Sequence, residues 1–213
     1  MHRARTRATE PANIAPQEIH RMSVSSRNFK AVVLTSCFAL VVAGISMLAL
    51  ARAHAASPAP DLASVGSEAP NFTLPNQENQ PISLSDYKGK WVVLYFYPKD
   101  QTSGCSLEAH NFQRDIDKYH ALNAVVLGVS LDTVESHKAW CAKDGFSFKM
   151  LADPDHKVVD EYGVPVMDHN GMHFAQRDTF LISPDGKIVK EWQVKDIQNH
   201  SAEVLAAIRA DGK

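Results

Sequence analysis

The sequence has 213 residues, of which 45% are hydrophobic and 22% are charged, as expected for one globular domain with an additional segment. The formal net charge is −2, and residues 57–213 carry 15 Lys and Arg against 22 Asp and Glu, a formal charge of about −7. Such an acidic domain argues against a nucleic acid as partner, because it lacks the positive surface that phosphates require.

The N-terminal part has the pattern of an export signal. An uncharged apolar run of 20 residues, from residue 31 to residue 50, follows Arg27 and Lys30. After it, Ala53-His54-Ala55 offers the small residues that a signal peptidase recognises. We therefore expect residues 1–56 to export the rest of the chain to the periplasm or another extracytoplasmic space. An uncleaved membrane anchor is the alternative, because the apolar run is long enough to span a bilayer.

The rest of the chain divides into a short lead and one domain. Residues 57–66 contain Pro-Ala-Pro and no apolar pattern, which predicts a flexible lead. Residues 67–213 are expected to form a single domain. Residues 1–21 add nothing that an export signal needs, so Met22 is an alternative start to Met1.

Two continuous apolar runs, residues 91–97 and residues 124–129, predict strands that are buried on both faces of a sheet. Between them, apolar residues recur at helical spacing: Ala109, Phe112, Ile116 and Tyr119. A strand, a helix and a strand in this order predict a parallel pair joined by a crossover.

The second half of the domain continues the alternation of strands and helices. Helical patterns cover residues 133–143, 157–162 and 201–209. Residues 179–182 and 187–192 flank Ser-Pro-Asp-Gly, which predicts a β-hairpin. The order of elements predicts an α/β fold with a mixed central sheet and helices on both faces, a thioredoxin-like architecture.

Soft metal-binding side chains gather in one short segment around Gly171: Met167, His169, Met172 and His173. Outside the cytoplasm, such side chains are typical ligands of copper. We prefer a connecting loop as the interpretation of this segment, and we expect neither a metal nor another cofactor.

Cys105 stands where the strand at residues 91–97 passes into a helix. Ligands of open α/β sheets bind at the carboxyl ends of strands. Thr102 is the predicted N-cap, so Cys105 lies in the first turn, where free N–H groups and the helix dipole favour a thiolate. A buried structural cysteine is the alternative. The polar junction at Gly104 favours a nucleophile instead.

Pro98, Thr102 and Cys105 reproduce the Pro-x-x-x-Thr-x-x-Cys signature of peroxiredoxins. The surrounding sequence resembles the branch of bacterioferritin comigratory protein, or PrxQ. The likeness continues through Leu151-Ala152-Asp153-Pro154-Asp155 and covers almost all of residues 67–210. The resemblance implies a peroxidase that reduces hydrogen peroxide and organic hydroperoxides with a thiol and without a cofactor.

In this family, a cysteine attacks the peroxide while a threonine hydroxyl and an arginine support the charge on the departing oxygen. The resemblance assigns these roles to Cys105, Thr102 and Arg177. Arg177 follows Cys105 by 72 residues, so only the fold can bring the two together. The resemblance also implies that Pro98 shields the thiolate and that Tyr97 and Glu108 are supporting residues.

The sulfenic acid formed on the nucleophile must condense with a second thiol before it is reduced. Many members of the branch carry that thiol five residues later, where this sequence has His110. Cys141, 36 residues after Cys105, matches a subset of the branch, which implies an intramolecular disulfide that a thioredoxin-like dithiol donor recycles. The alternatives are that Cys141 is simply packed beside Trp140, and that an outside thiol completes the cycle.

Two other functions are compatible with a reactive cysteine on this fold. A thiol-disulfide exchanger would need a second cysteine close to the first, but Ser106, Leu107 and Glu108 follow Cys105. A peroxide sensor or a binding module switched by the disulfide is the other alternative. We expect a monomer that contacts a membrane only through residues 31–50, if these remain attached.

Overall fold

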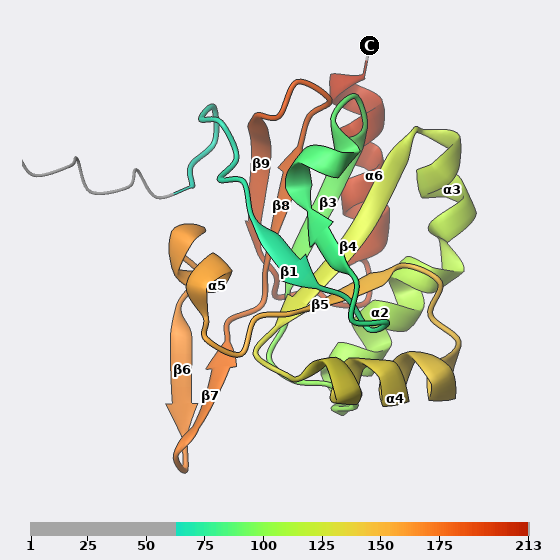
Figure 1. Cartoon of the computed structure of the whole chain (residues 1–213). Coiled ribbons are helices and arrows are strands. Elements are labelled where there is room, and N and C mark those ends of the chain that lie inside the picture. The colour runs from blue at the N-terminus through green and yellow to red at the C-terminus, as the bar shows by residue number, and fades with distance from the viewer. Residues whose placement is uncertain (1–62, 213) are drawn as a thin grey trace, which may run out of the picture. The chain divides into compact units, whose positions relative to one another are not determined.

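The computed structural model describes residues 63–212, which are built on a five-stranded sheet in the order β5-β4-β3-β8-β9 (Figure 1). The first three strands in chain order are parallel, and the last two run antiparallel to their neighbours. These strands are β3 (Trp91–Phe96), β4 (Ala124–Ser130), β5 (Lys149–Ala152), β8 (Asp178–Ile182) and β9 (Ile188–Gln193). The predicted mixed sheet and the predicted hairpin are confirmed.

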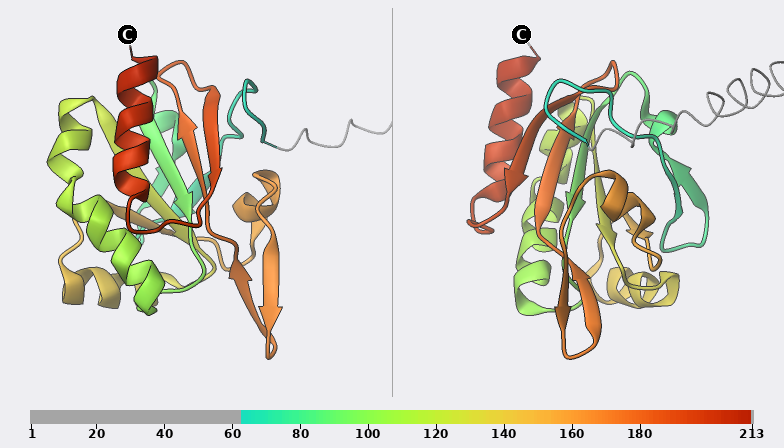
Figure 2. Two further views of the ribbon diagram at one scale, coloured as in Figure 1. Left: turned by 180° about the vertical axis from the view of Figure 1, so that it is seen from behind. Right: turned by 90° about the vertical axis from the view of Figure 1, so that its left-hand side faces the viewer.

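Helices cover both faces of the sheet (Figure 2). One face carries α2 (Ser103–Arg114), α3 (Ile116–Ala121) and α6 (His200–Asp211). The other face carries α5 (Lys157–Glu161) and the small hairpin of β1 (Thr73–Pro75) and β2 (Pro81–Ser83), which is followed by the 3-10 helix η1 (Leu84–Tyr87). The helix α4 (Val134–Asp144) lies near the carboxyl ends of β3 and β4 (Figure 1). This arrangement confirms the thioredoxin-like fold class.

The continuous apolar run of β3 is explained by the two cores that it separates. Val93, Tyr95 and Tyr97 pack into the cluster beneath α2 and α6. The alternate residues, such as Leu94 and Phe96, pack into the cluster on the opposite face. Because successive side chains of a strand point to opposite faces, both sets must be apolar.

The predicted helix between β3 and β4 is divided in two at Asp115. This residue leaves the helical conformation, and its carboxylate accepts hydrogen bonds from Arg114 and Lys118, both at 2.7 Å, and from Ser201 at 2.9 Å. Ile116 and Tyr119 remain buried after the break. The apolar spacing was therefore predicted correctly, but the break was not, because it depends on contacts made by side chains.

The prediction of a connecting loop around Gly171 is wrong. The segment forms a hairpin of β6 (Val166–His169) and β7 (Met172–Ala175). Asn170 and Gly171 connect the strands with φ angles of 54° and 75°, the left-handed conformation that two-residue hairpin turns require. The Asn-Gly pair was the available signal for this hairpin.

The predicted export segment, residues 1–56, lies outside the described residues. Between residues 63 and 212, no helix is long and apolar enough to cross a membrane.

Candidate active site

The loop after β3 places Cys105 in the first turn of α2. Thr102 is the N-cap and has an extended backbone, and its carbonyl accepts from Ser106 N–H at 2.8 Å. Cys105 is 1% exposed. The Thr102 hydroxyl does not cap the helix but donates to the Lys99 carbonyl at 3.0 Å. Its lone pairs therefore remain free to accept a hydrogen bond from an O–H group of a ligand.

Strand pairing brings Arg177 to the same place. Asp178, the first residue of β8, pairs with Phe96, the last residue of β3, so Arg177 lies beside the end of the strand that leads to Cys105. One guanidinium nitrogen, Nη2, donates to Cys105 Sγ at 3.1 Å, and the other, Nη1, donates to Glu108 Oε2. The planar guanidinium thus connects the thiol with a carboxylate one turn further along α2.

For both Arg177 and Glu108, burial and the neighbouring charge shift the pKa in opposite directions. Burial by itself lowers the pKa of Arg177, but the neighbouring Glu108 carboxylate and Cys105 sulfur raise it above its ordinary value. Burial raises the pKa of Glu108 to about 7, although Arg177 opposes this shift. Glu108 Oε1 has no hydrogen-bond partner within residues 63–212. Glu108 therefore titrates near neutral pH, next to the thiol.

We expect Glu108→Gln to remove a pH-dependent loss of stability. Folding raises the pKa of Glu108 from 4.5 to about 7, so between these values the unfolded chain releases the proton that the folded protein keeps. Stability from this group is complete below pH 4.5 and is lost as the pH rises to about 7. Denaturant unfolding across this range should show wild type losing stability relative to Glu108→Gln. Glu161→Gln, at an exposed position, is the matched control. A stability difference between wild type and Glu108→Gln that does not change with pH would contradict the raised pKa of Glu108.

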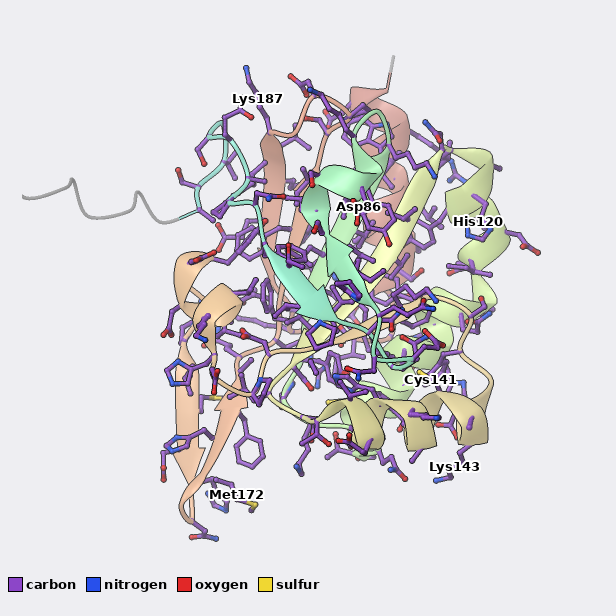
Figure 3. The ribbon with its side chains drawn as sticks, in the orientation of Figure 1. Asp86, His120, Cys141, Lys143, Met172 and Lys187 are labelled. Atoms are coloured by element: carbon purple, nitrogen blue, oxygen red, sulfur yellow. The ribbon has the colours of Figure 1, made fainter. Side chains whose placement is uncertain are left out.

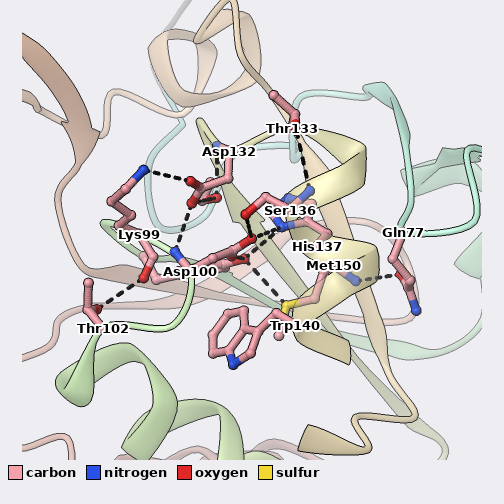
Figure 4. Close-up of polar contacts among 12 residues, drawn as sticks. Gln77, Lys99, Asp100, Thr102, Asp132, Thr133, Ser136, His137, Trp140 and Met150 are labelled. Carbon is pink, nitrogen blue, oxygen red and sulfur yellow. Dashed lines mark hydrogen bonds and ion pairs between the residues drawn. The ribbon is translucent and has the colours of Figure 1, made fainter. Parts of the chain in front are cut away.

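A buried polar network joins the loop that precedes Cys105 to α4 (Figure 4). The carboxylate of Asp100 accepts from the Tyr97 hydroxyl at 2.8 Å and the Ser136 hydroxyl at 2.7 Å, and it lies 2.8 Å from His137 Nδ1. The backbone N–H of Asp100 donates to Asp132 at 2.8 Å. We call Tyr97, Asp100, Ser136 and His137 the loop tether, because they fasten the loop to the first turn of α4.

The loop tether adds a contact to one predicted position, Tyr97, and brings in residues that were not predicted. Tyr97 is completely buried, and its hydroxyl donates to Asp100 and holds the loop, while its side chain belongs to the same apolar cluster as Cys105. Pro98 is half-buried and directly follows this tyrosine. Sequence reasoning missed Asp100 and its partners on α4. Their signal was a Ser-His pair at a helix start, which by itself indicates no particular role.

Cys141 lies on α4, one turn after His137, and its thiol is free. Burial and the nearby carboxylates of Asp100 and Glu78 raise the pKa of this thiol to about 12. Cys141 packs against the same apolar cluster that contains Cys105. His110 occupies the position of the missing local cysteine, and its Nε2 lies 3.6 Å from Asp144 Oδ2 at the end of α4. Both cysteines thus border one core, but each is held in its own helix.

Comparison with known proteins agrees with this geometry. The AhpC/TSA family model matches residues 65–191. Peroxiredoxin Bcp of Bacillus subtilis is 38% identical over 148 residues, which cover 68% of this chain and 94% of that protein. The crystal structure of a cysteine-to-serine mutant of Xylella fastidiosa PrxQ is similar at 36% identity with a TM-score of 0.66, over 71% of this chain and 98% of that chain.

A Xanthomonas campestris bacterioferritin comigratory protein, whose structures concern its alkyl peroxide reduction activity, is also similar. It shares 33% identity with a TM-score of 0.62, over 67% of this chain and 92% of that chain. These matches favour the peroxidase over the sensor and the disulfide exchanger. The chain belongs to the AhpC/TSA family and is a peroxiredoxin of the Bcp/PrxQ branch, a thiol peroxidase.

Proposed function

We propose that Cys105 is the peroxidatic cysteine and that Thr102 and Arg177 position its substrate. The Cys105 thiolate attacks one peroxide oxygen, the O–O bond breaks, and the second oxygen leaves and takes up a proton as water or an alcohol. The sulfur is oxidised by two electrons to a sulfenic acid. The contact that carries this proposal is the hydrogen bond of 3.1 Å from Arg177 Nη2 to Cys105 Sγ. An N–H donor at the sulfur is also close to the charge that develops on the peroxide.

Cys141 is the proposed resolving cysteine. Its thiolate attacks the sulfenic sulfur, hydroxide leaves and becomes water, and an intramolecular disulfide remains. The raised pKa of Cys141, about 12, makes it a poor nucleophile in the described conformation. Release of α4 from its buried position would reverse this shift, so we expect local opening of α4 to precede resolution.

Mass spectrometry of the intact full chain tests this assignment. After one equivalent of peroxide, wild type should lose two hydrogens, whereas Cys141→Ser should gain one oxygen on Cys105 and form no intramolecular disulfide. Cys105→Ser is the negative control and should consume no peroxide. Wild type that retains a stable sulfenic acid would exclude Cys141 as the resolving residue and would favour an outside thiol.

We propose organic hydroperoxides as substrates in addition to hydrogen peroxide, because the similar Xanthomonas protein reduces alkyl peroxides. The disulfide would be reduced by a dithiol protein such as a thioredoxin-like donor. Both cysteines lie in one chain and border one core, so the cycle requires no second copy. A monomer is therefore the proposed working form, and sedimentation of the reduced and oxidised protein would test it.

Export of the protein remains a proposal that rests on the sequence. The uncharged run at residues 31–50, the basic residues before it and the small residues after it support this proposal. Cell fractionation followed by N-terminal sequencing would test it. A new N-terminus close to Ala56 would indicate cleavage, an intact N-terminus in the membrane fraction would indicate an anchor, and an intact chain in the cytoplasm would contradict export.

A further inference from the structure

The β6–β7 hairpin extends from the body of the domain, and its tip carries the side chains whose role the peroxidase activity does not explain (Figures 1 and 2). Its register pairs Met167 with Phe174, Asp168 with His173, and His169 with Met172. Directly opposite residues of an antiparallel pair point to the same face, and alternate residues of one strand share that face.

This register sorts the side chains into two faces. Met167, His169 and Met172 share one face with Phe174, which we call the thioether face. His173 and Asp168 lie on the other, where His173 Nδ1 is 3.5 Å from Asp168 Oδ2. The thioether face therefore holds two sulfur atoms and one imidazole without a carboxylate.

Both methionines on this face are exposed, although methionine is usually buried. Met167 is 44% exposed and Met172 is 50% exposed, whereas Met150 is completely buried. Figure 3 shows Met172 at the end of the hairpin, away from the central sheet. Only four large apolar side chains of residues 63–212 are exposed, and these methionines are two of them. Core packing does not account for their presence.

Thioether and imidazole donors without carboxylates suit a soft monovalent cation and not a hard one. His169 and Met172 face each other, with Cβ atoms expected about 5 Å apart, and the diagonal to Met167 is about 7 to 8 Å. Methionine has three rotatable bonds, so both sulfurs can turn towards one ion. In the described part of the chain, no group of three or more His, Cys, Asp or Glu could hold a metal ion.

We propose that the thioether face binds Cu(I), with the sulfur atoms of Met167 and Met172 and one imidazole nitrogen of His169 as ligands. His169 Nε2 lies 3.3 Å from the side-chain nitrogen of Asn170, a contact that binding through this nitrogen would replace. The site is separate from Cys105, and it departs from the expectation of no metal that the sequence suggested.

Methionine methyl NMR under anaerobic conditions tests the proposal. The full chain is prepared with Cys37, Cys105 and Cys141 replaced by serine, because thiolates also bind Cu(I). At one equivalent of Cu(I), or of Ag(I) as a redox-inert probe, the methyl signals of Met167 and Met172 should shift. The signal of buried Met150 should not, and it serves as the internal control. If this background does not fold, wild type with metal in excess over its thiols gives the same readout.

The two faces supply a matched pair of variants. His169→Asn should weaken Cu(I) binding by at least tenfold in competition with a coloured Cu(I) chelator, and Met172→Leu should do the same. His173→Asn, on the opposite face of the same strand pair, should leave the affinity unchanged. Three results would overturn the proposal: unshifted Met167 and Met172 methyl signals, an equal loss from His169→Asn and His173→Asn, or tighter binding of Zn(II) than of Cu(I).

Discussion

Replacing Arg177 by methionine is expected to slow the reaction of Cys105 with peroxide by about 100- to 1,000-fold, the usual cost of removing a donor that stabilises a developing negative charge. Arg177 is well placed for this role because its Nη2 donates to Cys105 Sγ at 3.1 Å while Nη1 is held by Glu108. Arg177→Lys keeps the charge but loses the two guanidinium nitrogens that donate side by side. Its rate should therefore lie between those of Arg177→Met and wild type. Single-turnover consumption of peroxide by the reduced full chain measures the effect.

The same substitution also leaves the buried Glu108 without its cation, so loss of folding must be separated from loss of chemistry. Adding Glu108→Gln to Arg177→Met removes the unpaired carboxylate and should restore stability but not the rate. Arg209→Met, at an exposed position of α6, is the matched control and should react like wild type. If Arg177→Met reacts with peroxide at the wild-type rate, the proposed role of Arg177 is wrong.

The Asp100→Asn variant should loosen the loop tether and speed resolution. In wild type, the Asp100 carboxylate accepts from the Ser136 hydroxyl and lies 2.8 Å from His137 Nδ1. An asparagine amide would present an N–H donor where one of these partners also donates. A buried hydrogen bond lost in this way should cost about 2 kcal/mol. Because about 1.4 kcal/mol corresponds to a tenfold change in population, the opened form of α4 should rise by at least tenfold.

Two measurements distinguish loosening of the tether from general loss of stability. Hydrogen exchange should accelerate most in the first turn of α4, and disulfide formation after peroxide addition should become faster than in wild type. Asp155→Asn, which alters an exposed pair with Lys157, is the control and should change neither rate. Unchanged exchange in α4, or slower disulfide formation, would show that the loop tether does not limit resolution.

The sequence alone determined the layers of the fold, because the apolar runs and turn residues that indicate strands and helices are local patterns. The unbroken run at residues 91–97 indicated a strand between two cores, and the hairpin around Ser-Pro-Asp-Gly followed from its turn residues. Cys105 was placed at a helix N-terminus for the same reason. The apolar pattern did not predict the break at Asp115, where side chains of Arg114, Lys118 and the distant Ser201 donate to the carboxylate, whereas the turn at Asn170-Gly171 did have a local signal in its Asn-Gly pair.

The family resemblance had already assigned Arg177 to Cys105, but only the tertiary structure shows how the two residues meet. Arg177 is distant in sequence, and the antiparallel pairing of β8 with β3 brings it to the sulfur. Likewise, the contact between the Asp100 carboxylate and His137 Nδ1 joins segments that are 37 residues apart, and no periodicity predicts such a contact. The spacing of apolar residues specifies which face is buried, whereas strand order and register decide which polar groups converge. The sequence therefore predicted a reactive cysteine at the start of a helix, and the packing of the sheet determined which side chains lie beside it.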